Sequence, residues 1–255
     1  MTVVTMERRG STALLTLNRP EARNAVSPEV SQAMAGFLDE IEEDDDLRAV
    51  VITGAGEVFC AGADLKVVAT GRAAEIASGK GGFAGMHTRN FPKPVIAAVN
   101  GPALAGGFEL VLSSDLVVAA DTAKFGIPEA KRGLLAAAGG LIRLPKRVPL
   151  AIALEMAMTG DPITAERALA LGLVNKVVPV ADVVPEALAL AETIAANSPI
   201  AVRMSRRIVR ESIELSEEEG FNLTNTLGIE VFTSGDAIEG ATAFAEKRAP
   251  VWKSR

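Results

Sequence analysis

One stretch of the chain, PVIAAVNGPALAGGFEL at residues 94–110, constrains the fold more than any other. It opens with an apolar run rich in Val and Ile, bounded by Pro94 and Asn100-Gly101, which predicts a short buried strand. Gly106-Gly107 then lead into an apolar run that contains Glu109, which predicts the first turns of a buried helix. Bare backbone N–H groups at such a helix start favour an anion or a developing oxyanion. The stretch therefore predicts a site for negative charge on oxygen, with Glu109 close to it.

The order of the predicted elements gives the fold class. We expect two short strands within residues 2–17 and a buried strand at RAVVIT, residues 48–53. A helix is expected to start at Ser27, a favourable N-cap, with Pro28 at its first position. From residue 150 onward the pattern is largely helical. Strand–helix alternation followed by helices predicts an α/β core with a helical C-terminal region. The Gly- and Ala-rich residues 66–92 are expected to be the least rigid part, either a mobile lid or a surface loop.

Composition narrows the class of function. The net charge of −6 disfavours nucleic acid or an anionic membrane as the main partner. No apolar run reaches the ~20 residues of a membrane span, and the N-terminus lacks the order of a signal peptide. One Cys allows no internal disulfide, which fits a reducing cytoplasm. One Cys and one His also leave no cluster for a transition metal, so we expect a cytoplasmic protein without one.

Two carboxylates are the candidates for proton transfer. Glu109 and Glu129 each lie in apolar surroundings that contain Gly or Pro, and burial there would raise their pKa values toward neutral pH. Either one could instead be a structural glutamate that holds a hydrogen bond or an ion pair. The spacing does not show whether the two meet in space.

Other candidate chemistries are less well supported. His87 could be a general base, but no G-x-S-x-G elbow exists to partner it, so a surface or pocket-lining histidine is expected. Cys60 lacks a fixed base nearby and is expected to be a small buried residue. Gly54-x-Gly56 lacks the third glycine of a dinucleotide loop. Gly101 and Gly106 have phosphate-loop spacing without the Gly-Lys-Ser/Thr that such a loop requires.

Taken in order, the motifs resemble the crotonase superfamily over essentially the full length, and within it the enoyl-CoA hydratases. The matching segments are LNRPEARNA at 17–25, VITGAGEVFCAGADLK at 51–66, NGPALAGGFEL at 100–110, FGIPEAKRG at 125–133, GGLIRLPKRV at 139–148, TGDPITAERALALGLVNKVV at 159–178 and GATAFAEKR at 240–248. Each segment alone is a weak signal, whereas this order is highly specific. The resemblance implies an α/β fold, with a crotonase-like ββα spiral core at 1–197 and a helical C-terminal trimerisation region at 198–255.

The resemblance also implies how a site would work. The backbone N–H groups of Ala63 and Gly106 would form an oxyanion hole for a thioester oxygen. Glu109 and Glu129 would hold a water between them, Glu109 activating it for attack on C3 and Glu129 delivering or removing the proton at C2. Isomerase-like members generally keep only one of these glutamates, so the presence of both favours hydration of trans-2-enoyl-CoA thioesters. No metal or redox cofactor is implied, since coenzyme A is part of the substrate.

Further implications concern coenzyme A and the assembly. The residues that match the family's CoA contacts are Ala22, Arg23, Ala61, Gly62, Asp64, Leu65, Phe244 and Lys247. The last two reach CoA, often from a neighbouring subunit, in a homotrimer or a hexamer built as a dimer of trimers. Lys247 could instead be an exposed helix charge.

The chain departs from the hydratase pattern at one loop. Residues 136–144 read AAAGGLIRL where hydratases often read P-G-A-G-G-T-Q-R-L, although the Ala137 N–H could still bind water. This pattern is also similar to carnitinyl-CoA dehydratases. Alternatives are therefore Δ3-Δ2 isomerisation or carnitinyl-type dehydration. Two non-catalytic alternatives are an RNA-binding member of the superfamily and a catalytically silent member. Some members bind RNA through a Lys-rich helix, which this chain lacks.

Overall fold

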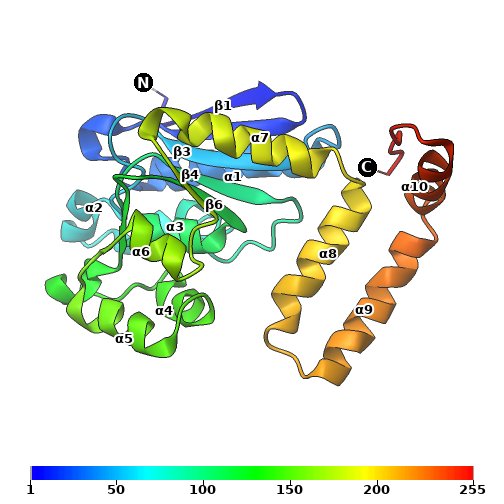
Figure 1. Ribbon diagram of the computed structural model, residues 1–255. Helices are drawn as coiled ribbons and strands as arrows, with labels where there is room; N and C mark the ends of the chain where they lie inside the picture. The colour runs from blue at the N-terminus through cyan, green and yellow to red at the C-terminus, as the bar shows by residue number, and fades with distance from the viewer. Residues whose placement is uncertain (1, 255) are drawn as a thin grey trace.

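The computed structural model describes residues 2–254 and is built on a six-stranded sheet (Figure 1). In spatial order its strands are β1 (Val4–Arg9), β2 (Thr12–Leu17), β3 (Ala49–Gly54), β4 (Val95–Val99), β6 (Leu116–Ala120) and β9 (Lys176–Val178). β1 and β2 pair as an antiparallel hairpin, and every other neighbouring pair in this sheet is parallel. The predicted α/β class is therefore confirmed.

The central strands are apolar along nearly their whole length, as strands that are buried on both faces of a sheet need to be. Every residue of β3 and β4 is buried, as expected for parallel strands between helices. On one face, α7 (Val183–Ala195) packs across β3, β4 and β6. Helix α1 (Pro28–Glu43) begins as predicted, with Pro28 in its first turn and the Ser27 hydroxyl accepting a hydrogen bond from the Val30 N–H at 3.5 Å.

A second, smaller sheet joins segments that are distant in sequence. It contains β5 (Ala103–Leu104), β7 (Lys124–Gly126) and β8 (Ile163–Thr164), with β5 parallel to β7. Helix α3 (Gly106–Ser113) begins directly after β5, and the short helix η4 (Pro128–Arg132) begins directly after β7. Because the two strands lie side by side, the elements that follow them start from adjacent positions.

The rest of the core consists mostly of short helices, of which α6 packs against β7 and β8. The Gly- and Ala-rich segment folds into α2 (Leu65–Ala69), η2 (Ala73–Ala77) and η3 (Phe83–Gly85). The remaining elements of the core are η1 (Pro20–Ala22), α4 (Gly140–Arg143), η5 (Leu144–Lys146), α5 (Leu150–Thr159), α6 (Ala165–Ala170) and η6 (Val180–Asp182).

The C-terminal helices extend away from the sheet. In Figure 1, α8 (Pro199–Ser212) and α9 (Glu217–Phe232) form an antiparallel pair, and α10 (Gly235–Glu246) follows α9 at the end of the pair where α8 begins. Asp115, just before β6, anchors α8 by accepting hydrogen bonds from Arg206 Nε and Arg210 Nη1, both at 2.7 Å. The division of the chain between residues 197 and 198 remains a prediction.

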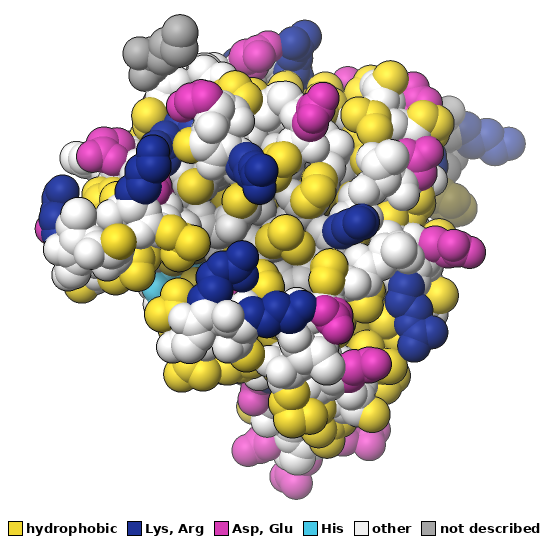
Figure 2. All heavy atoms as spheres, turned by 90° about the vertical axis from the view of Figure 1, so that its left-hand side faces the viewer, with side chains coloured by type: hydrophobic (Ala, Val, Ile, Leu, Met, Phe, Trp, Pro, Cys, Tyr) yellow, Lys and Arg dark blue, Asp and Glu magenta, His cyan; other side chains and the backbone are white. Residues whose placement is uncertain are grey.

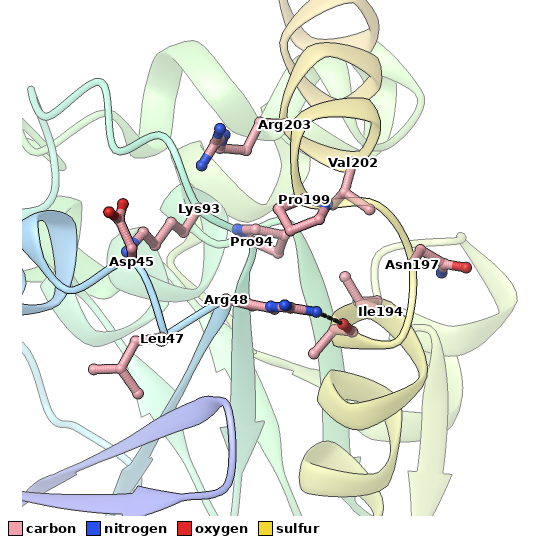
Figure 3. Close-up of a pocket in the computed structure, with 11 residues that line it drawn as sticks. Asp45, Leu47, Arg48, Lys93, Pro94, Ile194, Asn197, Pro199, Val202 and Arg203 are labelled. Atoms are coloured by element: carbon pink, nitrogen blue, oxygen red, sulfur yellow. Dashed lines mark hydrogen bonds between the residues drawn. The ribbon is translucent and has the colours of Figure 1, made fainter. Parts of the chain in front are cut away.

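A small pocket lies beside the connection between the end of α7 and the start of α8 (Figure 3). Arg48 Nη1 donates to the Ala195 carbonyl at 2.9 Å, which ties the end of α7 to the start of β3. Lys93 is buried nearby, and its ammonium donates to the carbonyls of Ile41 and Asp44 at the end of α1. The volume of this cavity is about 10 Å³, enough for about one water molecule. The pocket is therefore part of the packing rather than a substrate site.

Over residues 2–254, none of the helices combines the length and the apolar character that crossing a lipid bilayer requires.

Candidate active site

A pocket of about 470 Å³ opens beside the start of α3, within the usual size range of small-molecule sites, roughly 300–1,000 Å³. It is lined by Arg23, Ala61, Ala63, Leu65, Val68, Ala73, Ala77, Phe83, His87, Leu104, Ala105, Gly106, Glu109, Pro128, Glu129, Arg132, Leu134, Leu135, Ala137 and Ala138. Most of these side chains are apolar. The two candidate glutamates, far apart in the sequence, therefore meet in one cavity.

Two glycine loops contact each other at the pocket wall. Gly62 has a φ of +94°, and a Cβ there would lie 2.7 Å from Ala105 Cβ and 2.9 Å from Gly106 N. A side chain at Gly62 would thus separate the loop that carries Ala63 from the start of α3. Within residues 2–254, neither the Ala63 N–H nor the Gly106 N–H donates a hydrogen bond to the protein. Both residues line the pocket, so each offers an unused backbone donor there.

The glycine pair at the start of α3 is required by packing. A Cβ on Gly106 would lie 2.3 Å from the Phe83 ring, and a Cβ on Gly107 would lie 2.1 Å from the Cys60 carbonyl oxygen. Packing against Phe83 and Cys60 thus requires both glycines. Gly106 nevertheless lines the pocket, and the approach of a ligand to its N–H stays a prediction. The preceding residue, Ala105, has a φ of +52°, a conformation that non-glycine residues adopt at a cost of about 1–3 kcal/mol.

Glu109 projects from the first turn of α3 and is only 3% exposed. Its Oε1 accepts a hydrogen bond from the Gly140 N–H at 2.8 Å. The pKa of Glu109 is raised to about 7: burial is the main cause and the negative charge of Glu129 adds to it, against the opposing effect of the Gly140 N–H. A carboxyl with this pKa exchanges protons readily at neutral pH.

Glu129 projects from η4 on another wall of the same pocket. Its Oε2 is buried and has no hydrogen-bond partner among the described residues. Burial is the main cause that raises the pKa of the Glu129 carboxyl. A buried polar atom without a partner is costly in a stable protein, so its presence here marks a place for a ligand atom or a proton.

The other two chemical candidates behave as expected. His87 lines the pocket, and its Nδ1 accepts a hydrogen bond from the Phe83 N–H at 2.7 Å. Burial, followed by the nearby Arg143 charge, lowers the pKa of His87 and favours the neutral ring. Cys60 is fully buried, and burial raises the pKa of its thiol to about 12, which disfavours a thiolate nucleophile.

The residues that match CoA contacts are only partly brought to the pocket. Arg23, Ala61 and Leu65 line it. Asp64 instead binds Arg19 Nη2 at 3.1 Å, accepts the Lys66 N–H, and so anchors the loop. Ala22 lies in η1, and Gly62 packs against the start of α3.

Phe244 and Lys247 are at the far end of the molecule, in and just after α10, and do not line this chain's pocket.

The sequence indicated some features of the site and not others. The segment at 66–92 supplies pocket walls through Val68, Ala73, Ala77 and Phe83. The Gly140 N–H bond to Glu109 joins residues 31 positions apart, and nothing local indicates that pairing. The expected water donor, Ala137, does line the pocket.

Comparisons with known proteins agree over nearly the whole chain. The family model "Enoyl-CoA hydratase/isomerase" matches residues 7–255. An enoyl-CoA hydratase of Mycobacterium tuberculosis is 43% identical over 98% of this chain and 96% of its own. A carnitinyl-CoA dehydratase of Proteus mirabilis is 45% identical over 97% of each chain.

Two solved structures are similar as well. A crystal structure of an enoyl-CoA hydratase from M. tuberculosis superposes with a TM-score of 0.95 at 47% identity and full coverage of both chains. A carnitinyl-CoA hydratase from Mycobacterium avium superposes with a TM-score of 0.79 at 48% identity, also with full coverage of both chains.

Proposed function

This chain is a hydro-lyase of the enoyl-CoA hydratase/isomerase family with the crotonase fold, and we propose that it adds water reversibly to trans-2-enoyl-CoA thioesters. One observation carries the proposal. Two carboxyls with raised pKa values, those of buried Glu109 and half-buried Glu129, share a pocket with two backbone N–H groups that have no partner within residues 2–254. Hydration of a conjugated thioester needs a base, an acid and a place for negative charge on the carbonyl oxygen.

The proposed reaction assigns one task to each group. Ionised Glu109 takes a proton from water as the water oxygen forms a bond to C3. The electron pair of the C2–C3 double bond moves toward the thioester oxygen, where the Ala63 and Gly106 N–H groups stabilise it. Protonated Glu129 then gives its proton to C2. The product gains one water, and proton exchange between the two carboxyls and solvent restores the starting state.

The two donors are expected to supply much of the barrier reduction. They lie on separate loops held in contact by Gly62, so they are positioned before substrate arrives. Each such donor typically contributes ~3–4 kcal/mol to the barrier for forming an oxyanion. The proposal requires no resident metal or redox cofactor.

The coenzyme A portion is proposed to run past Arg23, Ala61 and Leu65 at the pocket mouth. Figure 2 shows the side of the molecule that is on the left in Figure 1. There part of the histidine side chain (cyan) is visible, and Lys and Arg side chains (dark blue) lie on the same face among Asp and Glu side chains (magenta). Positive side chains suit the phosphates of coenzyme A.

A second candidate is dehydration of carnitinyl-CoA. The similarity to carnitinyl-CoA dehydratases and the alanines at 136–138 favour it. Such a substrate carries a trimethylammonium group, which proteins often bind with several aromatic faces. Among the pocket-lining residues in 2–254, Phe83 is the sole aromatic, and Arg23 and Arg132 add positive charge. These features favour an uncharged acyl chain.

The test uses purified protein with crotonyl-CoA in water labelled with ¹⁸O. The proposal predicts loss of the conjugated thioester absorbance and a label at C3 of the product. A 3-enoyl-CoA and a carnitinyl-CoA thioester, assayed in parallel, distinguish isomerase and dehydratase activity. Turnover of carnitinyl-CoA with a higher kcat/KM than crotonyl-CoA would favour the second candidate, and inertness toward all three would overturn both.

We further propose that the chain assembles as a homotrimer or a dimer of trimers through its C-terminal helices. α9 and α10 expose large apolar side chains, among them Phe221 at 61%, Phe232 at 80% and Phe244 at 87%. Exposed large apolar side chains concentrated on two helices are typical of a protein interface. In a trimer, Phe244 and Lys247 could reach a neighbouring pocket. A monomer by light scattering at micromolar concentration would contradict this assembly.

A further inference from the structure

An arginine near the pocket is held in an unusual way. Arg143, at the end of α4, is half-buried, and its guanidinium makes no ion pair within residues 2–254. It donates only to neutral oxygens: from Nη1 to Ser113 Oγ at 3.2 Å and to the Ala138 carbonyl at 3.1 Å, and from Nη2 to the His87 carbonyl at 2.5 Å. Burying a charge without a counter-ion costs free energy. Burial accordingly lowers the pKa of Arg143.

The three oxygens belong to three segments that surround Glu109. Ser113 lies one turn after Glu109 on α3, and its hydroxyl donates to the Glu109 carbonyl at 2.9 Å. Ala138 lies two residues before Gly140, whose N–H binds the Glu109 carboxylate at 2.8 Å. His87 lines the pocket. One guanidinium therefore joins α3, the 138–140 loop and the 66–92 segment.

The loop is shaped to accept this guanidinium. Gly139 has a φ of +101°, and a Cβ on it would lie 2.0 Å from Arg143 Nη1. Gly140 is nearly as constrained, because a Cβ there would lie 3.0 Å from Glu109 Oε1 and 3.1 Å from Glu109 Cγ. The two glycines thus leave room for the arginine on one side and for the carboxylate on the other.

We propose that Arg143 is a positioning residue for Glu109: by fixing the Ala138 carbonyl, it keeps the Gly140 N–H on one carboxylate oxygen and leaves the other for water. Arg143 does not line the pocket, so it acts through these groups rather than on substrate. The planar guanidinium can donate to all three oxygens at once. A lysine ammonium does not reproduce this planar geometry, so lysine is not expected to replace arginine fully.

Charge adds to this geometric role. The charges that affect the Glu109 carboxyl are those of Glu129 on η4 and Arg143 on α4, while His87, Arg23 and Arg132 line the same pocket. Burial and Glu129 raise the pKa of Glu109, whereas the Gly140 N–H, the Ala138 N–H and, least of these, the Arg143 charge lower it. Loss of Arg143 would remove the charge and loosen the Gly140 N–H. Both effects raise the pKa of Glu109 beyond about 7.

The first test measures the Glu109 carboxyl directly in the unliganded protein. Glutamate labelled with ¹³C at the carboxyl is titrated by NMR, and the Glu109 signal is assigned by its absence in Glu109→Gln. Arg143→Gln is expected to raise the midpoint by about one pH unit, with a smaller rise in Arg143→Lys. Arg147→Gln is the matched control, because Arg147 is also half-buried and donates to a carbonyl, that of Ser114 at 2.5 Å. It should leave the midpoint unchanged.

The second test is kinetic and rests on the proposed hydration. At neutral pH, Arg143→Gln is expected to lower kcat about 10-fold or more while changing KM less than about twofold, since the residue orients the base and not the thioester. The acid limb of the kcat profile should move to higher pH together with the NMR midpoint. Arg147→Gln should move neither.

The two tests separate this proposal from the proposed function. Wild-type protein without hydratase activity would overturn the function, yet the NMR midpoint would still decide the role of Arg143. An identical Glu109 midpoint in Arg143→Gln and Arg147→Gln would overturn the positioning role. If Arg143→Gln does not fold, a folded Arg143→Lys variant with wild-type midpoint and wild-type kcat would overturn it equally.

Discussion

Replacing Glu109 by glutamine should stabilise the fold, and should do so more at alkaline than at acidic pH. Burial raises the pKa of Glu109 from 4.5 to about 7, so the folded state holds this proton more tightly than the unfolded chain does. Folding therefore takes up a proton between about pH 4.5 and about pH 7, and stability falls as the pH rises through that window. At about 1.4 kcal/mol per pKa unit, the loss amounts to roughly 3 kcal/mol.

Glutamine has no proton to lose, and its Oε1 can still accept the Gly140 hydrogen bond. The free energy of unfolding of Glu109→Gln, relative to wild type, should therefore rise by roughly 3 kcal/mol between about pH 4.5 and about pH 8. Urea unfolding at fixed protein concentration measures this difference. Glu155→Gln, an exposed carboxyl on α5, is the control and should show no such trend. A Glu109→Gln difference that stays constant across this pH range would refute the argument that burial destabilises the ionised carboxyl.

Two further substitutions test the structure around the site. Gly62→Ala should lower kcat by about 100-fold, because a Cβ 2.9 Å from Gly106 N pushes the two donor loops apart; steady-state kinetics within roughly twofold of wild type would contradict this. Asp115→Ala should lower the free energy of unfolding by about 3 kcal/mol, because it leaves Arg206 and Arg210 partly buried without their carboxylate. Thermal and urea unfolding would show a loss below about 1 kcal/mol if α8 were not held by these pairs.

Much of the fold could be predicted from local patterns. The apolar run ending at Val99 and the Ser27-Pro28 helix start are determined by neighbouring residues, and the structure confirms both. The small sheet of β5, β7 and β8 was not predicted, because strands of two or three residues leave no periodic pattern. Yet the pairing of β5 with β7 is what places the elements carrying Glu109 and Glu129 next to each other.

The site was only partly predictable for a similar reason. Composition and neighbours indicated that each glutamate could be buried; Glu109 is buried, whereas Glu129 is half-buried, and the pKa values of both are raised. Their convergence came from a family resemblance and not from spacing. The Arg143 contacts join residues up to 56 positions apart, so no local pattern could reveal them. The pocket walls supplied by the 66–92 segment likewise depend on tertiary packing of a stretch that has little periodicity of its own.

The most direct measurement is kcat with crotonyl-CoA for Glu109→Gln, Glu129→Gln and the double variant. Since the two carboxyls are proposed to act in the same hydration, each single variant should lose about 10²–10⁴-fold in kcat. The double variant should lose little more than the worse single one, because removing either group already disables the pair. A single variant with wild-type kcat, or a double variant whose loss equals the product of both single losses, would contradict the joint action of Glu109 and Glu129.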